Sequence, residues 1–318
     1  MHKNVLKSKQ KVVTNLIDDQ MLNVAIIGTG LIGGSMALDL RKLKKTKKII
    51  GVDSNQEHLY RAKQLGIIDD SLPLKQAIGE SDLIILAAPV DISIRLLPEI
   101  LSEVDKQVVF DVGSTKENII KCVDNYAKRG RFVATHPMAG TEYSGPDAAL
   151  NNLFRNKSVM ICDSEGSDTD ALDLVKEIYE FLGMNIVFMD PKPHDLHAAY
   201  VSHISHISSF ALSLTVLEKE KIEKNILDMA SGGFDSTVRL AKSSPAMWTP
   251  IFMQNSGNIV DVLNSYISVL QKFKNIILEH DSKKIFELIQ QSNEIRKVLD
   301  KFQQKSELTQ LNSISKQK

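Results

Sequence analysis

Residues 22–35, LNVAIIGTGLIGGS, decide the fold of this 318-residue chain. An apolar run ends at Gly28-x-Gly30-x-x-Gly33, and the next apolar segment, residues 49–53 (IIGVD), ends in an acid. A strand, a glycine turn, a helix and a strand-end acid at this spacing are typical of a βαβ unit that binds a dinucleotide. Gly28 allows the tight turn, Gly30 lets the backbone approach a pyrophosphate, and Gly33 lets the helix pack against the strand. The stretch therefore predicts a nucleotide-cofactor protein.

The acid at the end of the second strand, Asp53, favours NAD over NADP. Its carboxylate can accept hydrogen bonds from both ribose hydroxyls of adenosine and repels a 2′-phosphate, and Ser54 and Asn55 follow it instead of an arginine. The free N–H groups at the start of the first helix then bind the phosphates. The cofactor-binding residues that we predict are Gly28, Gly30, Leu31, Ile32, Gly33, Asp53, Ala88 and Pro89.

The composition is that of an ordinary globular protein. Hydrophobic residues make up 43% of the chain, and Lys+Arg and Asp+Glu number 39 each. A formal net charge of zero gives no overall field toward nucleic acid or an anionic membrane, so we expect neither as a partner. The basic run at residues 41–48 follows the first predicted helix, where cations favour the helix dipole. The two cysteines, Cys122 and Cys162, lack metal-ligand spacing, and we expect no metal.

The pattern along the chain predicts two domains. Helices are expected at 55–65, 73–79, 91–103 and 115–128, and strands at 22–27, 49–53, 83–88, 107–112, 132–135, 158–162 and 185–189. This alternation predicts an α/β, Rossmann-type doubly wound domain over residues 21–190. From residue 194 only helical periodicity remains, so 191–302 is expected to be an all-helical domain, with Ser244 and Pro245 starting a helix.

The ends of the chain are expected to be tails. Residues 1–20 lack the apolar core of a signal peptide and are interpreted as an extension or a disordered tail, as are the Gln- and Ser-rich residues 303–318. No apolar run approaches the roughly 20 residues of a membrane span. We therefore expect a cytoplasmic protein.

Polar motifs follow two of the predicted strands: DVGSTK at residues 111–116 and HPMAG at residues 136–140. Ligands of open α/β sheets bind outside the carboxyl ends of the strands. His136 can take a proton near neutral pH and is suited to be the general base in the oxidation of an alcohol, although a strand-end histidine can also be structural. Ser114 is expected to cap the helix that follows it, in addition to any ligand contact.

Two features stand out in the helical region. His203 and His206 share a helix face, but without nearby cysteines or an HExxH arrangement they do not predict a zinc site. In residues 232–241, GGFDSTVRLA, two glycines interrupt the helical pattern shortly before Arg239. The planar guanidinium of Arg239 suits a substrate carboxylate, although a single arginine is more often structural.

Taken in order across residues 22 to about 302, these motifs resemble the prephenate dehydrogenase family of tyrosine biosynthesis. They are GTGLIGGS, Asp53, DVGSTK, HPMAGTEYSG, HDLHAAYVSHISH and GGFDSTVRLAKSSPAMW. The resemblance implies NAD-dependent oxidative decarboxylation of prephenate to 4-hydroxyphenylpyruvate. It makes His136 the catalytic histidine, Ser114 its assistant, and His206 and Arg239 the residues that hold the substrate. It also implies a homodimer formed through the helical domain, which the apolar stripe of residues 256–302 favours.

Three alternatives stay open. Glu142 could bind the ammonium group that arogenate carries in place of the keto group of prephenate, and it is therefore included among the substrate-binding residues. A β-hydroxyacid dehydrogenase of the two-domain type would rely on a helical lysine in place of the histidine. A non-catalytic NAD-sensing regulator would need only the dinucleotide motif.

Overall fold

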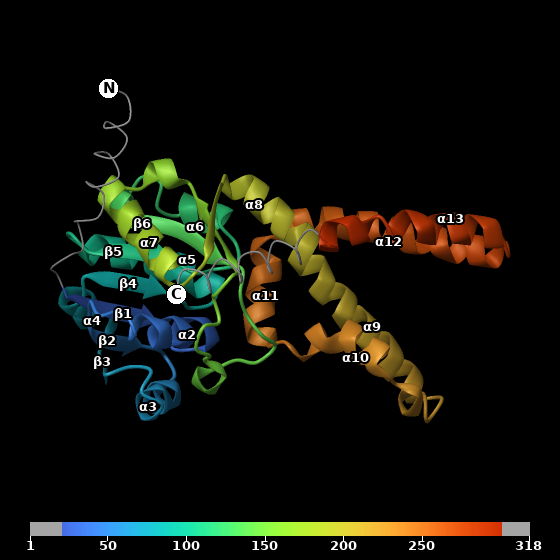
Figure 1. Ribbon diagram of the computed structural model, residues 1–318, viewed down its shortest axis with the longest axis horizontal. Helices are drawn as coiled ribbons and strands as arrows, with labels where there is room; N and C mark the ends of the chain where they lie inside the picture. The colour runs from blue at the N-terminus through green and yellow to red at the C-terminus, as the bar shows by residue number, and fades with distance from the viewer. Residues whose placement is uncertain (1–20, 301–318) are drawn as a thin grey trace, which may run out of the picture. The chain divides into compact units, whose positions relative to one another are not determined.

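A computed structural model describes residues 21–300 (Figure 1). The chain divides into two compact units. The first comprises the chain up to His194 together with Lys242–Gln254, and the second comprises Asp195–Ala241 and the chain from Asn255. The tails predicted at 1–20 and 303–318 lie outside the described residues. The two units are described separately below.

The first unit is built on an eight-stranded sheet in the order β3-β2-β1-β4-β5-β6-β7-β8 (Figure 1). Its strands are β1 (Leu22–Ile27), β2 (Thr46–Val52), β3 (Asp70–Ser71), β4 (Leu83–Leu86), β5 (Val108–Asp111), β6 (Phe132–Pro137), β7 (Ser158–Cys162) and β8 (Asn185–Met189). Neighbouring strands are parallel except for β6 and β7. The strand order reverses between β1 and β4, the switch point at which doubly wound sheets bind ligands.

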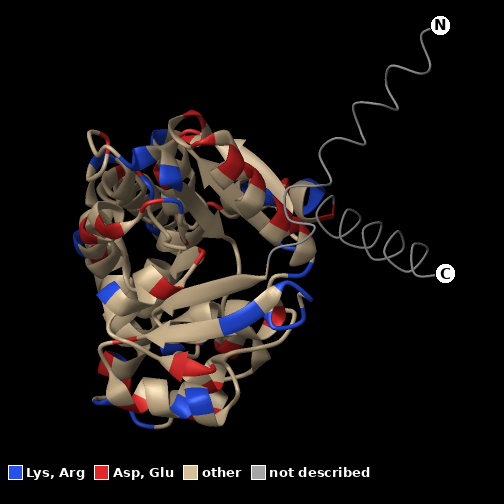
Figure 2. Ribbon diagram, turned by 90° about the vertical axis from the view of Figure 1, so that its left-hand side faces the viewer, with Lys and Arg blue, Asp and Glu red and all other residues tan. Residues whose placement is uncertain are grey.

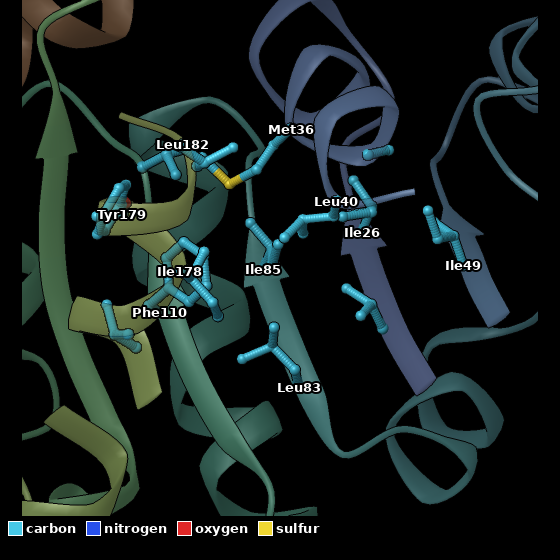
Figure 3. Packing of buried hydrophobic residues seen from close by; sticks show 14 of the residues in the cluster. Ile26, Met36, Leu40, Ile49, Leu83, Ile85, Phe110, Ile178, Tyr179 and Leu182 are labelled. Carbon is cyan, nitrogen blue, oxygen red and sulfur yellow. The ribbon is translucent and has the colours of Figure 1, made fainter. Parts of the chain in front are cut away.

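Helices cover both faces of this sheet. They are α2 (Leu31–Leu40), α3 (Gln56–Gln64), α4 (Leu74–Glu80), α5 (Val90–Glu103), α6 (Glu117–Lys121) and α7 (Thr169–Phe181). Helix α11 (Pro245–Gln254) packs against α5, and α8 (Pro191–Ala198) follows β8. Side chains of a strand alternate between faces, so Val24 and Ile26 of β1 join one core cluster and Ala25 and Ile27 the other. Figure 3 shows the first cluster, in which Met36 of α2 and Tyr179 of α7 pack against the strands. The predicted doubly wound fold is confirmed.

Helix α6 differs from the prediction of a helix over 115–128. It ends at Lys121, because the N–H groups of Val123 and Tyr126 bond to carbonyls three residues back and the chain continues in turns. Lys116, and not Ser114, occupies the N-cap position directly before α6, and no side-chain hydrogen bond caps the helix there. The expected capping by Ser114 is therefore wrong.

Helices and turns make up the second unit, and its described residues contain no strand. It contains α9 (Ile204–Glu220), α10 (Gly232–Val238), α12 (Ser256–Leu278) and α13 (Ser282–Ser292), and the π-helical turn η5 (Ala199–His203) leads into α9. Helices α12 and α13 lie side by side (Figure 1). The predicted helical domain is confirmed, except that α11, which starts at Pro245 as predicted, packs in the first unit: its Trp248 and Ile251 contact Val90 of α5.

Charged residues of both signs are interspersed along the chain in the view of Figure 2. The basic run at residues 41–48 lies at the end of α2 and the start of β2, and several of its cations pair with acids. Arg41 contacts Asp69 at 2.8 Å, for example, and Lys42 contacts Asp39 at 2.7 Å. Among the described residues, no helix has both the length and the apolar character that crossing a membrane requires.

Candidate functional site

The glycine loop after β1 has two tightly packed glycines and one that faces open space. Gly28 has φ +99°, and a β-carbon there would lie 2.5 Å from the carbonyl oxygen of Ala87. A β-carbon at Gly33 would overlap the carbonyl oxygen of Gly28. At Gly30, by contrast, a β-carbon would meet no atom within 4 Å. The protein's own packing therefore requires Gly28 and Gly33, whereas Gly30 leaves room beside the loop for a ligand.

Helix α2 starts directly at this loop. No side chain caps its first N–H groups, so they remain available at the positive end of the helix dipole. Leu31 is buried and Ile32 half-buried in its first turn. The turn between β4 and α5, with Ala88 and the exposed Pro89, lies against Gly28 through Ala87. The ends of β1 and β4 thus bring these predicted cofactor residues together.

Asp53, at the end of β2, is held by several donors. One carboxylate oxygen accepts from the backbone N–H of Thr29 at 3.0 Å and from its hydroxyl at 3.1 Å. The other accepts from the backbone N–H of Asn55 at 2.9 Å, and Nδ1 of His58 lies 3.7 Å from the carboxylate. Thr29 occupies a variable position of the glycine motif, so sequence analysis had no signal for its role in fixing Asp53.

A fully buried ion pair joins the ends of β5 and β6. The ammonium group of Lys116 contacts the carboxylate of Asp111 and donates to the carbonyl oxygen of Thr135 at 2.7 Å. Asp111 also accepts from the backbone N–H groups of Gly113 at 2.9 Å and Thr135 at 3.1 Å. Thr135 directly precedes His136, so this network fixes the backbone that carries the predicted catalytic histidine. Sequence analysis quoted the motif without predicting the pair.

His136 is the second-to-last residue of β6 and is 9% exposed. Its Nδ1 lies 2.9 Å from Nε2 of His194, and the two rings pack edge to face with centroids 5.1 Å apart. His194 belongs to α8 and is 3% exposed. Ser114 lies half-buried after β5, and Glu142 lies half-buried in the loop after β6. The first unit thus places its three predicted catalytic and substrate residues near the carboxyl ends of the neighbouring strands β5 and β6: His136 within the end of β6, and Ser114 and Glu142 after β5 and β6.

His206 and Arg239 both lie in the second unit. His206 is half-buried on α9, with Nδ1 3.0 Å from the carbonyl oxygen of Ser202. Burial lowers the pKa of His206, and the positive charge of Arg239 lowers it further. A hydrogen bond of 3.1 Å from the Ser209 hydroxyl to the carbonyl oxygen of Thr237 joins α9 to α10. The unit therefore holds a cationic guanidinium within electrostatic reach of an imidazole that favours its neutral form.

His203 has a different environment from His206. It is 1% exposed, and its Nδ1 accepts a hydrogen bond of 3.1 Å from the side-chain amide of Asn255. The same amide donates to the carbonyl oxygen of Asp195 at 2.7 Å. The π-helical turn η5 ends at His203, and π-helical turns of this kind are frequent near functional sites. Within residues 21–300, no group of three or more His, Cys, Asp or Glu residues is placed to bind a metal ion.

Comparisons with known proteins agree with this arrangement. Two family models match the chain: "Prephenate dehydrogenase, nucleotide-binding domain" over residues 36–188 and "Prephenate dehydrogenase, dimerization domain" over residues 190–291. The prephenate dehydrogenase of Bacillus subtilis (strain 168) is 31% identical over 277 residues, which are 86% of this chain and 75% of that protein.

Two solved structures are similar over most of the fold. The prephenate dehydrogenase of Aquifex aeolicus in complex with hydroxyphenyl propionate and NAD+ is 31% identical with a TM-score of 0.79, covering 89% of this chain and 99% of that one. Synechocystis arogenate dehydrogenase is 27% identical with a TM-score of 0.70, covering 87% and 99%. From these matches and its two units, we conclude that the chain belongs to the prephenate dehydrogenase family.

Proposed function

We propose that this protein catalyses the NAD-dependent oxidative decarboxylation of prephenate to 4-hydroxyphenylpyruvate. The observation that supports it best is the buried His136, held at the carboxyl end of a strand of a dinucleotide-binding sheet. Prephenate is a cyclohexadienol that carries a ring carboxylate and a pyruvyl side chain. Neutral His136 takes the proton of the ring hydroxyl, with Ser114 assisting at the same atom. The ring carboxylate leaves as carbon dioxide, its electron pair stays in the ring, and the resulting phenolate oxygen takes a proton to give the phenol. Aromatisation makes the reaction effectively irreversible.

The residues around the glycine loop fit NAD. The open space at Gly30 and the uncapped start of α2 suit the pyrophosphate, and the fixed carboxylate of Asp53 suits the adenosine ribose. NAD, when bound there, accepts the hydride from the hydroxyl-bearing carbon of the ring. The sheet contributes the placement, because Ala88 and Pro89 follow β4 and His136 lies in the last two residues of β6, so all three are at carboxyl ends of strands in one sheet.

Alanine substitutions at two glycines test this cofactor site. Gly30→Ala is expected to change the free energy of unfolding by less than about 0.5 kcal/mol, because the added methyl meets no protein atom. It is expected to weaken NAD binding about tenfold or more, because the methyl occupies the space left for the pyrophosphate. Gly33→Ala, the matched control, is expected to lower stability by about 1–3 kcal/mol through overlap with the backbone. Denaturant unfolding and NAD titration measure both. Wild-type NAD affinity in Gly30→Ala would contradict the assignment.

Arg239 and His206 are assigned to hold the substrate. A guanidinium can bind a carboxylate of prephenate through paired, charge-assisted hydrogen bonds, and neutral His206 beside it can hydrogen-bond without adding a second positive charge.

Arg239→Ala is expected to raise the KM for prephenate about 10- to 100-fold, with a smaller change in kcat, because charge-assisted hydrogen bonds to the substrate are lost. Arg239→Lys keeps the charge without the planar fork and should recover only part of the loss. Steady-state NADH formation at varied prephenate separates the two parameters. A KM equal to that of the wild type in Arg239→Ala would remove this residue from the substrate site.

The reaction itself is tested by a substrate panel. NADH formation is measured with prephenate, with arogenate and with several hydroxy acids, and we expect prephenate to give the highest kcat/KM. A preference for arogenate would change the proposed substrate to arogenate. Glu142 and the similarity to Synechocystis arogenate dehydrogenase favour this alternative substrate. Turnover of hydroxy acids alone, or NAD binding without any turnover, would contradict the proposal.

We assign homodimer formation to the helical unit, whose matching family model is described as a dimerization domain. Large apolar side chains are exposed along α9, α12 and α13, among them Leu214, Leu217, Ile267, Leu270, Ile277 and Phe286. Apolar surface of this extent usually marks an interface between proteins. Light scattering at micromolar concentration should give twice the mass of 35.4 kDa. A monomer would contradict the assignment, and Ile267→Glu should shift the equilibrium toward it.

A further inference from the structure

We infer that His194 is a positioning residue, which fixes the nitrogen of His136 that takes the proton of the substrate. The inference rests on the proposed function, in which His136 is the base. The evidence is the hydrogen bond of 2.9 Å between Nδ1 of His136 and Nε2 of His194. His194 is in direct contact with His136 and acts through it on the substrate.

A hydrogen bond between two imidazole rings requires one nitrogen to carry the proton and the other to offer its lone pair. If Nδ1 of His136 carries the proton, its Nε2 has a lone pair and can accept the hydroxyl proton of the substrate. If His194 donates instead, neutral His136 must carry its proton on Nε2 and cannot act as a base there. The pair is therefore productive in one arrangement only, with His194 as the acceptor.

The same bond is retained and strengthened when His136 becomes charged. After Nε2 has taken a proton, Nδ1–H still donates to His194, and the donor is now an imidazolium. Charge-assisted hydrogen bonds are roughly twice as strong as neutral ones. Because the positive charge develops on His136 as the proton moves, this bond stabilises the transition state more than the ground state.

Both rings are held by regular structure, which gives the pair a defined geometry. His136 is paired with Met160 across β6 and β7. His194 lies in the first turn of α8, where its backbone N–H bonds to the carbonyl oxygen of Asp190 at 3.0 Å. The side chains are 9% and 3% exposed, with ring planes 70° apart. Little water reaches this hydrogen bond, and a ring nitrogen's partner is what sets the tautomer of a histidine, so we assign to His194 the acceptor role at Nδ1.

The test uses three replacements of His194 in the full chain. Glutamine places its amide oxygen near the position of Nε2 and can accept from Nδ1–H of His136. Asparagine places its amide near the position of Nδ1, too far back to reach, and leucine offers no acceptor. We expect His194→Leu and His194→Asn to lower kcat about 10- to 100-fold, as part of the factor that a general base contributes. We expect His194→Gln to stay within about threefold of the wild type, and the affinities for NAD and prephenate to change little in all three.

A direct observation complements the kinetics. In protein labelled with ¹⁵N-histidine, His136, assigned through its loss in His136→Asn, should show a protonated Nδ1 and an unprotonated Nε2 at neutral pH. His194→Gln should retain this tautomer and His194→Leu should lose it. The wild-type spectrum answers the question even if a variant fails to fold, and a proton on Nε2 of neutral His136 would overturn the inference.

The outcomes separate this inference from the proposed function. A wild-type kcat in His194→Leu together with an inactive His136→Asn would overturn the role of His194 alone. A kcat in His194→Gln no higher than in His194→Asn would overturn it as well. Wild-type turnover in His136→Asn would instead remove His136 as the base, and the proposed mechanism with it.

Discussion

Replacing His136 by asparagine is expected to lower kcat with prephenate about 10²- to 10⁴-fold, the range that a positioned general acid or base contributes. The imidazole is the group at this strand end that can take the ring hydroxyl proton, and asparagine cannot replace it in that role. Asparagine does retain a polar group near the position of Nδ1, which lies 2.9 Å from His194, so the fold should tolerate the change. Steady-state NADH formation gives kcat, and a fluorescence titration gives the affinity for NAD, which we expect to stay within about twofold.

A matched control is His280→Asn. His280 is exposed between α12 and α13 and has φ +54°, a conformation that asparagine adopts readily. This change removes an imidazole from a place with no assigned part in the reaction, and kcat should stay at the wild-type value. If His136→Asn turned over prephenate as fast as the control, another group would have to take the proton.

The fold class could be predicted because its signals are local. Gly28 and Gly33 lie where a side chain would collide with neighbouring atoms, so the motif reports a packing requirement of the turn itself. The strand ending at Asp53 and the apolar runs after it follow from short-range patterns. The antiparallel pairing of β7 with β6 was not predicted, because the pattern of one strand does not encode the direction of its neighbour.

The candidate site was predicted less completely, because its contacts join distant residues. His136 and Arg239 were selected from strand-end position, motif and family resemblance. The partners that hold the site were missed: His194 is 58 residues from His136 in sequence, and Lys116 bonds to a carbonyl 19 residues away. Lysine is rarely buried, so the residue type alone predicts that Lys116 is exposed to solvent. An opposite charge at the end of the buried strand β5, five residues earlier, was the available signal for the ion pair.

The packing of α11 in the first unit was missed for the same reason. Its helical periodicity is correct, but periodicity does not state against which elements a helix packs. Trp248 and Ile251 contact Val90 of α5, which lies more than 150 residues earlier. The predicted domains, 21–190 and 191–302, are each one continuous stretch of chain. In the structure the first unit consists of two stretches, because Lys242–Gln254 belong to it as well.

Lys116→Met is expected to lower the free energy of unfolding by about 3–5 kcal/mol, the usual result of removing one partner of a buried ion pair. Methionine fills most of the space of the lysine stem, so the main effect is on charge. The carboxylate of Asp111 keeps its bonds from Gly113 and Thr135 but loses the ammonium group, in a site with no exposure to water. Urea unfolding at neutral pH measures the difference. We expect kcat to fall too, because Lys116 holds the carbonyl of Thr135, the residue directly before His136.

The pH dependence separates this charge effect from a packing defect. Burial raises the pKa of the Asp111 carboxyl, and Lys116 is the main group that opposes the rise. Without Lys116 the folded-state pKa lies further above the unfolded value, so the folded variant binds the proton more readily, and its deficit relative to the wild type should shrink as pH falls from 8 toward 5. Asp111→Asn combined with Lys116→Met removes both charges and should be more stable at pH 8 than Lys116→Met alone. A deficit that is independent of pH, with no recovery in the double variant, would show that lost packing of the lysine stem, rather than the unpaired carboxylate, destabilises the fold.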